Sequence, residues 1–374
     1  MLKKIMYVAF VITVSYLYGV YAIYGSTPFL RKSYFIEAWW AKTNIKCQHD
    51  YSVFLKNFLE KVVSDYGSLS NQLVYLKKDG NIESCNSGAN VNEDTRFRYA
   101  SLTKVITAAL FLENEKLGLL NREDDLRQYI EMKHPVDARM QKIQLFNLLT
   151  HTSGFDRTQS NDPIIQEGKS WCPNHLEKLN YIRLDHQPNT VYSYDNRNYC
   201  VLGAVLAKKI GQPFSVILND YLAFHHFDHI KFIDGPFMPD EVDYDFRFEE
   251  YYFPSYTQKY DFYAMQSAAG LSGSAKDYAK LIHYFIDQRK LLLTQTVLEI
   301  TDTGKKNNSL SIGLQQTTTS KGEVISYHFG ALPASRSMLI IRGNGDILVW
   351  TGSGVPEKKG YNDATLLKYI ADQF

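Results

Sequence analysis

A serine and a lysine three residues apart stand at the head of a long apolar stretch, and this combination constrains the chain more than any other feature. Ser101 and Lys104 are followed by the apolar run Val105–Leu112. Side chains at this spacing share one face of a helix, and a helix that is apolar nearly all round is buried. A buried lysine is costly unless it is paired or neutral. Two interpretations follow: an N-cap serine with a lysine that reaches solvent, or a nucleophile with an activating amine beside it.

Length and charge limit the kind of protein. The chain has 374 residues, of which 45% are hydrophobic, so it can bury a large core as one domain or two closely joined ones. Lys and Arg number 41 against 40 Asp and Glu, a formal net charge of +1. This balance provides no electrostatic footprint for nucleic acid, so no nucleic-acid partner is expected. The sequence leaves the oligomeric state open.

The amino terminus predicts attachment to a membrane. Residues 1–4 form a short tail, and residues 5–24 carry no charged side chain over a length that spans a bilayer as a helix. A cleaved signal peptide is the alternative, because Val20 and Ala22 suit a cleavage site, but the length of the run favours an uncleaved anchor. Basic residues flank both ends and do not decide the topology. A large domain after a short tail favours a single-pass protein of the cell membrane with its domain outside the cytoplasm, in the periplasm.

Two further features of the chain leave alternatives open. Residues 25–48 are interpreted as a juxtamembrane linker with Trp39 and Trp40 as interfacial anchors, or as a segment that packs on the domain through residues 36–40. The four cysteines lack the spacing of a zinc site. They form either two disulfides, in one of three connectivities, or four thiols; they are Cys47, Cys85, Cys172 and Cys200.

Periodicity predicts an α+β domain over residues 49–374. A helix with apolar spacing at residues 54–63 precedes two short strands around Asp79-Gly80, a hairpin signal. Four strands are expected at residues 309–314, 324–328, 337–342 and 347–351, with a final helix from residue 363. We therefore expect an antiparallel sheet built from both chain ends and flanked by helices, with a mainly helical insertion between them. The aromatic tract at residues 242–263 is either a rim over a pocket or a packed surface subdomain.

Three motifs follow one another along the chain. They are Ser101-x-x-Lys104, Tyr194-Asp195-Asn196 and His328-Phe329-Gly330, with a supporting match at residues 148–154. In this order they resemble the serine β-lactamase and penicillin-binding-protein-like family, in its branch of class C-type β-lactamases, D-stereospecific peptidases and esterases. The resemblance covers about residues 49–374 and implies a β-lactamase/transpeptidase-like fold.

The resemblance also implies roles for individual residues. Ser101 would attack an acyl carbonyl, Lys104 would help to take the serine proton, and Tyr194 is similar to the family's tyrosine base. As a phenol, Tyr194 needs a nearby cation to ionise. Asn196 would bind the substrate amide or hold Lys104, and the backbone N–H groups of Ser101 and Ala331 would form the oxyanion hole. The substrate-binding set is Asn196, His328, Gly330, Ala331 and Arg336. No metal or organic cofactor is implied.

The third motif departs from the family's K-T-G pattern. It lacks both the lysine and the hydroxyl that would bind a substrate carboxylate, and this argues against an efficient β-lactamase. Arg336 is our candidate for the missing cation. We expect a membrane-anchored serine hydrolase that acts on a small-molecule or peptidoglycan-like ester, amide or D-amino-acid peptide of the cell envelope. The alternatives are a penicillin-binding or sensor-like protein with little turnover, and a β-lactamase.

Overall fold

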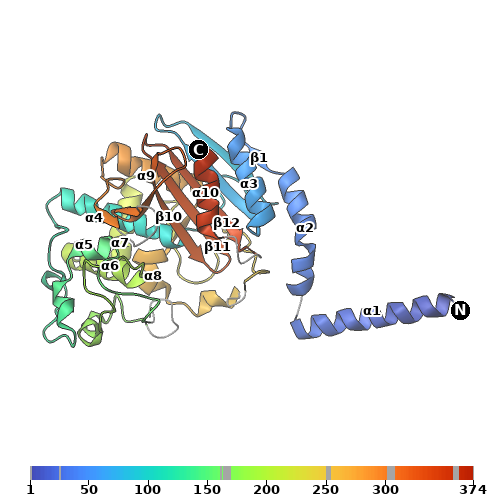
Figure 1. The fold of residues 1–374 in the computed structure, drawn as a ribbon, viewed down its shortest axis with the longest axis horizontal. Coiled ribbons are helices and arrows are strands. Elements are labelled where there is room, and N and C mark those ends of the chain that lie inside the picture. The colour runs from blue at the N-terminus through green and yellow to red at the C-terminus, as the bar shows by residue number, and fades with distance from the viewer. Residues whose placement is uncertain are drawn as a thin grey trace.

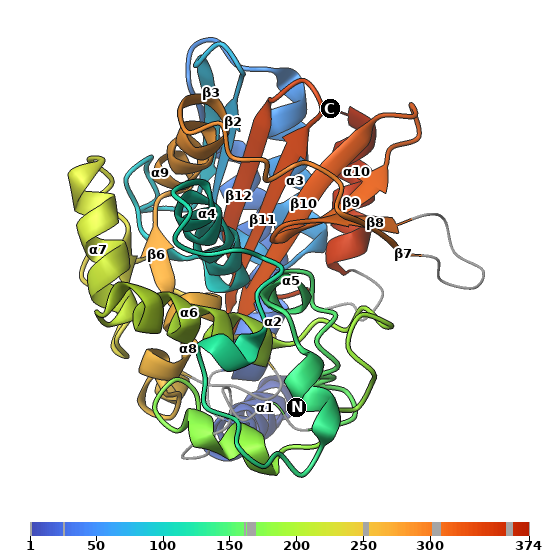
Figure 2. The ribbon, with the colours of Figure 1, turned by 90° about the vertical axis from the view of Figure 1, so that its left-hand side faces the viewer.

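The centre of the molecule is an antiparallel sheet that joins the two ends of the domain. The structure is a computed structural model and describes residues 2–24, 27–160, 162, 170–249, 254–300, 308–356 and 362–373. Within these residues nine strands pair in the order β1-β3-β2-β12-β11-β10-β9-β8-β7 (Figures 1 and 2). Their bounds are β1 Lys46–Cys47, β2 Ser68–Leu76, β3 Ile82–Ser87, β7 Leu298–Ile300, β8 Asn308–Ser311, β9 Leu314–Thr318, β10 Val324–Leu332, β11 Ser335–Arg342 and β12 Ile347–Gly354.

Strand pairing confirms the predicted α+β architecture. The hairpin β2–β3 turns at Gly80, whose φ of +91° is a left-handed conformation that suits glycine. The last strand, β12, pairs antiparallel with β2, so both chain ends build the sheet. One prediction was wrong in detail, because residues 309–314 are not a single strand. The chain turns at Gly313, with φ +78°, and forms the two strands β8 and β9.

Helices cover both faces of this sheet. On one face, α3 (Val53–Asp65) and α10 (Asp363–Gln373) pack on the central strands and form one apolar cluster with them (Figure 2). The other face carries the larger core and the helical insertion. The helices on that side are α4 Thr103–Lys116, α5 Leu145–Leu149, α6 Asn196–Ile210, α7 Phe214–Phe224, α8 Phe262–Ala269 and α9 Ala275–His283. A small sheet lies among them, in the order β4 (Phe97–Arg98), β6 (Leu271–Gly273) and β5 (Lys231–Phe232).

The amino-terminal segment differs from a simple linker. Helix α1 (Leu2–Tyr24) projects from the body, and α2 (Thr27–Thr43) follows it (Figure 1). Helix α2 buries Tyr34, Ala38 and Ala41 against the domain, whereas Ile36, Trp39 and Trp40 are exposed, so the helix packs on the domain and leaves both tryptophans on its outer side. Among the described helices, no single one is both long and apolar enough to cross a bilayer; only the pair α6 and α7 passes together, across a bend of 78°. The anchor at residues 5–24 stays a prediction.

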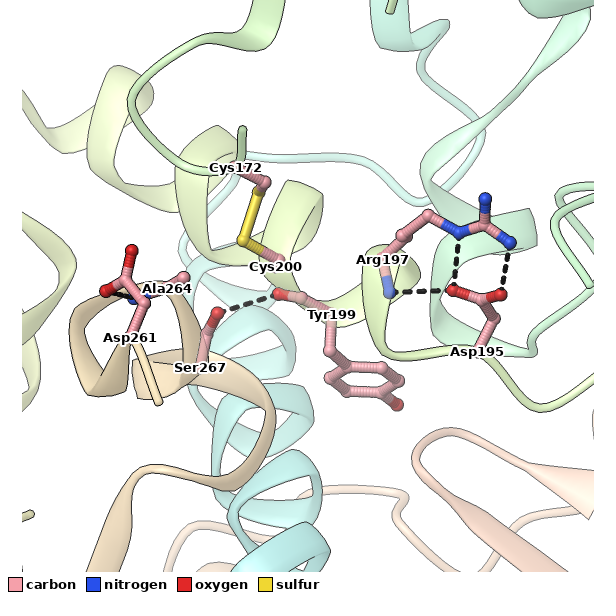
Figure 3. Close-up of a disulfide and its surroundings, with 8 residues drawn as sticks. All are labelled: Cys172, Asp195, Arg197, Tyr199, Cys200, Asp261, Ala264 and Ser267. Atoms are coloured by element: carbon pink, nitrogen blue, oxygen red, sulfur yellow. Dashed lines mark hydrogen bonds and ion pairs between the residues drawn. A yellow bond between two sulfur atoms is a disulfide. The ribbon is translucent and has the colours of Figure 1, made fainter. Parts of the chain in front are cut away.

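The four cysteines form two disulfides. Cys47 pairs with Cys85 and joins the edge strand β1 to its neighbour β3. Cys172 pairs with Cys200 and ties the long polar loop before α6 to that helix (Figure 3). Of the three connectivities that the sequence allowed, the structure selects the pairing of nearest neighbours along the chain.

Candidate active site

Ser101 lies in a short turn that is pressed against the open edge of a strand. The turn η1 (Ala100–Leu102) runs directly into α4. Strand β9 pairs with β10 only at residues 324–327, so the edge of β10 beyond Tyr327 is left for η1. A Cβ added to Gly330 would lie 2.3 Å from the Tyr99 carbonyl and 2.1 Å from Ser337 Oγ. Glycine is therefore required for this close approach.

The backbone before the serine is held by β11 and bent in an uncommon way. Hydroxyls of Ser335 and Ser337 donate to the carbonyls of Arg98 and Tyr99, at 2.9 and 2.7 Å. Ala100 has a φ of +50°, a left-handed conformation that costs a non-glycine residue about 1–2 kcal/mol. The packing of η1 between β10 and α4 thus imposes the turn that presents Ser101.

Lys104 is fully buried directly behind Ser101, as the apolar helix predicted. Its Nζ lies 3.1 Å from Ser101 Oγ, 2.7 Å from Asn196 Oδ1 and 2.9 Å from the Ala268 carbonyl. Burial lowers the pKa of this lysine from 10.5 to about 7, and the carboxylate of Asp162 opposes the shift only in part. A substantial fraction of Lys104 is therefore neutral near pH 7 and able to accept a proton.

The second motif lies at the head of α6, across from Lys104. Asp195 caps the helix by accepting a hydrogen bond from the Arg197 N–H, and its carboxylate pairs with the Arg197 guanidinium at 2.6 Å (Figure 3). This cap fixes the backbone on either side of Asp195, and with it the directions of the Tyr194 and Asn196 side chains. Asn196 reaches Lys104 with its carbonyl oxygen and donates from Nδ2 to Asp162 at 2.8 Å. The Asp162 carboxylate therefore sets which way the Asn196 amide points.

Tyr194 is held in its protonated form, so it can donate a proton but cannot accept one. Its ring centroid lies 5.0 Å from Lys104 Nζ. Burial raises the pKa of the Tyr194 hydroxyl, and the neighbouring Ser101 hydroxyl and Arg157 guanidinium offset this only in part. The buried hydroxyl has no hydrogen-bond partner of normal geometry among the described residues. A lysine of low pKa is also a weak source of the positive charge that a tyrosinate requires.

His151 packs against the ring of Tyr194 and bonds to the segment that carries it. Its Nδ1 lies 3.2 Å from the backbone N–H of Asp195 and 3.0 Å from Asn198 Nδ2, so it accepts from both. Burial holds the pKa of His151 well below its ordinary value, and its ring lies 4.6 Å from that of Tyr194. A neutral His151 therefore positions the second motif.

His328 presents an acceptor where K-T-G proteins have a cation. Its Nδ1 lies 2.7 Å from the Phe329 carbonyl, which can only accept, so Nδ1 carries the proton and Nε2 has a free lone pair. Burial lowers the pKa of His328 to about 3, with a further contribution from Lys104. The side chain is therefore neutral over the physiological range.

One cavity of about 480 Å³ connects these groups. It is lined by six of the eight residues predicted from sequence, namely Ser101, Tyr194, Asn196, His328, Ala331 and Arg336. Lys104 lies behind Ser101, and Gly330 does not line the cavity but allows η1 to approach β10. From the aromatic tract, Glu249 and Tyr260 line the cavity, whereas Phe248 and Tyr256 are buried.

Two arginines line the cavity, and they differ in how they are held. Arg336 donates to the carbonyls of Leu332 and Ser335 at 2.6 and 2.9 Å, and Glu249 lies 3.9 Å away. The Arg336 guanidinium is therefore already partly satisfied by groups of the protein itself. Arg157 lies with its Cζ 4.8 Å from the ring of Tyr194 and has no ion-pair partner within the described part of the chain.

Sequence reasoning missed several residues of this site. Arg157 and Asp162 belong to a polar loop before α6, and no motif or periodic pattern marks either position. Tyr192 and Gln315 also line the cavity, and Gln315 Nε2 donates to the Tyr192 hydroxyl at 2.8 Å. Of these residues, only Tyr192 had a signal in the sequence, because it lies two positions before the second motif. The loop reaches the cavity because the disulfide Cys172–Cys200 and the cap of α6 fold it back there.

Comparisons with known proteins agree with this geometry. The chain is 34% identical over 264 residues to the "Probable fimbrial assembly protein FimD, serogroup H1" of Dichelobacter nodosus, an alignment that covers 68% of this chain and 66% of the relative. The chain thus spans just under two thirds of that relative's length.

Solved structures share the fold. A D-stereospecific amidohydrolase from Streptomyces sp. superposes with a TM-score of 0.65 at 19% identity, covering 79% of this chain and 92% of that one. The "Beta-lactamase/D-alanine Carboxypeptidase" of Yersinia pestis superposes with a TM-score of 0.66 at 15% identity, covering 86% and 97%. The family model named Beta-lactamase matches residues 65–361. Since this match covers most of the domain and all three motifs, the chain belongs to the Beta-lactamase family.

Proposed function

We propose that the protein is a serine hydrolase that forms an acyl-enzyme on Ser101 and acts on an ester, amide or D-amino-acid peptide of the cell envelope. The observation that carries this proposal is the 3.1 Å contact between Ser101 Oγ and the buried Lys104 Nζ at the wall of the cavity. A nucleophile beside an amine whose pKa is about 7 has a base that works at neutral pH.

In this proposal, neutral Lys104 takes the Ser101 proton as Oγ attacks the acyl carbonyl. The oxyanion accepts hydrogen bonds from the backbone N–H groups of Ser101 and Ala331. Tyr194 donates its phenolic proton to the leaving group and regains one from the Lys104 ammonium. Water then hydrolyses the ester on Ser101, which restores the serine hydroxyl.

The departures in the third motif bear on the substrate. A neutral His328 accepts hydrogen bonds at Nε2, so it suits a substrate N–H or O–H better than a carboxylate. This favours an esterase, amidase or D-peptidase over a β-lactamase. We also propose that the protein is anchored at the cell membrane by residues 5–24, with its domain in the periplasm. Two disulfides support an oxidising compartment.

Two alternatives have specific support. A penicillin-binding or sensor-like protein with little turnover would share the acylation machinery and differ only in deacylation. A role in fimbrial assembly is favoured by the 34% identity to the Dichelobacter relative. Deleting the gene and scoring surface fimbriae tests that second role, and complementation with Ser101→Ala shows whether it requires acylation.

Labelling separates the hydrolase from the binder. The full chain in detergent is incubated with a fluorophosphonate and with a penicillin, and adducts are located by peptide mass spectrometry. We expect an adduct on Ser101, loss of labelling in Ser101→Ala, and turnover of a short acyl ester. Ser320→Ala, an exposed serine in the turn before β10, is the matched control and should label like the wild type. Labelling without turnover favours the binder, and no labelling at all contradicts both.

A further inference from the structure

The outward face of α2 is apolar where a surface helix is normally polar. Along this helix the exposed positions are residues 30, 31, 32, 35, 36, 39, 40 and 43, and the buried ones are Tyr34, Ala38 and Ala41. The four exposed side chains between residues 35 and 40 are all large and apolar. They are Phe35, Ile36, Trp39 and Trp40, with exposed fractions of 70%, 56%, 64% and 48%. A contiguous patch of this kind marks an interaction surface.

The helix is firmly attached by its opposite face, so the patch is not the result of loose packing. Glu37 pairs with Arg247 at 2.7 Å, and the rings of Tyr34 and Phe248 meet edge to face at 5.2 Å. The Tyr34 hydroxyl also donates to the Val63 carbonyl. These contacts hold α2 in one rotational setting, with its apolar side exposed and turned away from the domain.

Charge around the patch indicates the partner. Lys32 is exposed at the start of the same face, and Lys46 is exposed just after the helix, whereas the guanidinium of the exposed Arg31 reaches the domain and donates to the Arg247 carbonyl. The acid of the helix, Glu37, is paired with Arg247 on the inner side. Basic residues beside tryptophans on an exposed apolar face match an anionic lipid surface. A second copy of the chain would bring two basic rims together, which is unfavourable.

We propose that the outward face of α2 lies on an anionic lipid bilayer, with Phe35, Ile36, Trp39 and Trp40 in the boundary between headgroups and acyl chains. The helix is then an interfacial support that sets how the domain sits on the membrane. Phe248, which packs on Tyr34, is followed by Glu249 at the rim of the cavity. The bilayer thus lies beside the cavity rim. If the proposed acyl-transfer activity holds, this placement favours substrates carried at the membrane surface.

Tryptophan fluorescence tests this proposal without using activity. The chain has four tryptophans, and Trp171 and Trp350 are buried at 6% and 1% exposure, so accessible emission comes from Trp39 and Trp40. The full chain is reconstituted into vesicles of phosphatidylglycerol and phosphatidylethanolamine that contain lipids brominated near the headgroup. Quenching by the brominated lipid and by aqueous acrylamide is then measured. The matched control is Phe224→Trp in a Trp39→Ser/Trp40→Ser background, since Phe224 is 78% exposed on α7, away from α2 (Figure 1).

The two quenchers should give opposite results for the α2 tryptophans and for the control tryptophan on α7. We expect brominated lipid to remove most of the emission from Trp39 and Trp40 while acrylamide loses most of its effect on them. The control tryptophan should respond to acrylamide and not to brominated lipid. Emission from Trp39 and Trp40 that stays open to acrylamide in vesicles overturns the proposal. Shielding that needs no lipid and rises with protein concentration assigns the face to a second copy and also overturns it. Neither result depends on whether Ser101 is acylated.

Discussion

The buried Lys104 makes the stability of the protein depend on pH above about 7, and its contribution is best separated from that of the buried tyrosines below about pH 9. Its pKa falls from 10.5 in the unfolded chain to about 7 in the folded one. Between these values the unfolded chain binds a proton that the folded chain does not, so the free energy of unfolding rises with pH from about 7 upward. Each unit of pKa corresponds to about 1.4 kcal/mol, which gives an upper limit of about 5 kcal/mol over the whole range.

Urea denaturation at pH 7.5 and 8.5 measures this effect, below the range in which the tyrosines of the unfolded chain ionise. We expect the free energy of unfolding of the wild type to rise by up to about 1.4 kcal/mol between the two values, and that of Lys104→Met to stay nearly constant. Only the pH dependence is compared, because methionine also leaves the acceptors on Asn196 and Ala268 unpaired. Lys280→Met, an exposed lysine on α9, is the control and should keep the wild-type slope. The buried His328 titrates near pH 3, well below the window.

The protonation state of Lys104 also sets the pH dependence of catalysis, because a base is active only in its deprotonated form. If neutral Lys104 is the base, kcat/KM for a neutral ester should rise through an apparent pKa near 7 and then level off. Lys104→Met should lower acylation by about 10²–10⁴-fold. Equal pH slopes for the unfolding of wild type and Lys104→Met would refute the reasoning, because they would mean that the folded protein keeps the lysine protonated across the window.

Three further predictions concern the frame of the site. Gly330→Ala should lose about 1–3 kcal/mol of stability and most labelling at Ser101, because the added methyl group collides with the turn; wild-type labelling would contradict this. Replacing both Cys172 and Cys200 by serine opens a loop of 28 residues and should cost about 3.5 kcal/mol in urea denaturation; a loss below about 1 kcal/mol would argue against that entropic estimate. Arg157→Ala should raise KM for carboxylate-bearing substrates more than Arg336→Ala does, because the Arg336 guanidinium is already hydrogen-bonded to the Leu332 and Ser335 carbonyls; equal effects on steady-state KM would contradict this ranking.

Much of the fold was visible in the chain because local patterns and backbone geometry dictate it. The apolar run after Lys104 predicted a buried helix, and α4 is buried through its first twelve residues. Asp79-Gly80 predicted the turn of the first hairpin. The N-cap of α9 is equally local, because Ser274 accepts from the Asp277 N–H three residues later, at 3.1 Å. These features depend on neighbours within a few residues, so the sequence alone is sufficient to find them.

The sequence by itself determined which helix carries the serine and lysine, and in which order the other two motifs follow. Tertiary structure alone decided what surrounds them. Asp162 and Arg157 reach the site from a loop that has no periodic pattern, and Gly330 is needed for a contact with a turn more than two hundred residues away in the chain. The low pKa of Lys104 likewise arises from burial among segments distant in sequence. Desolvation and close packing depend on the assembled environment of a side chain, and no local pattern encodes that environment.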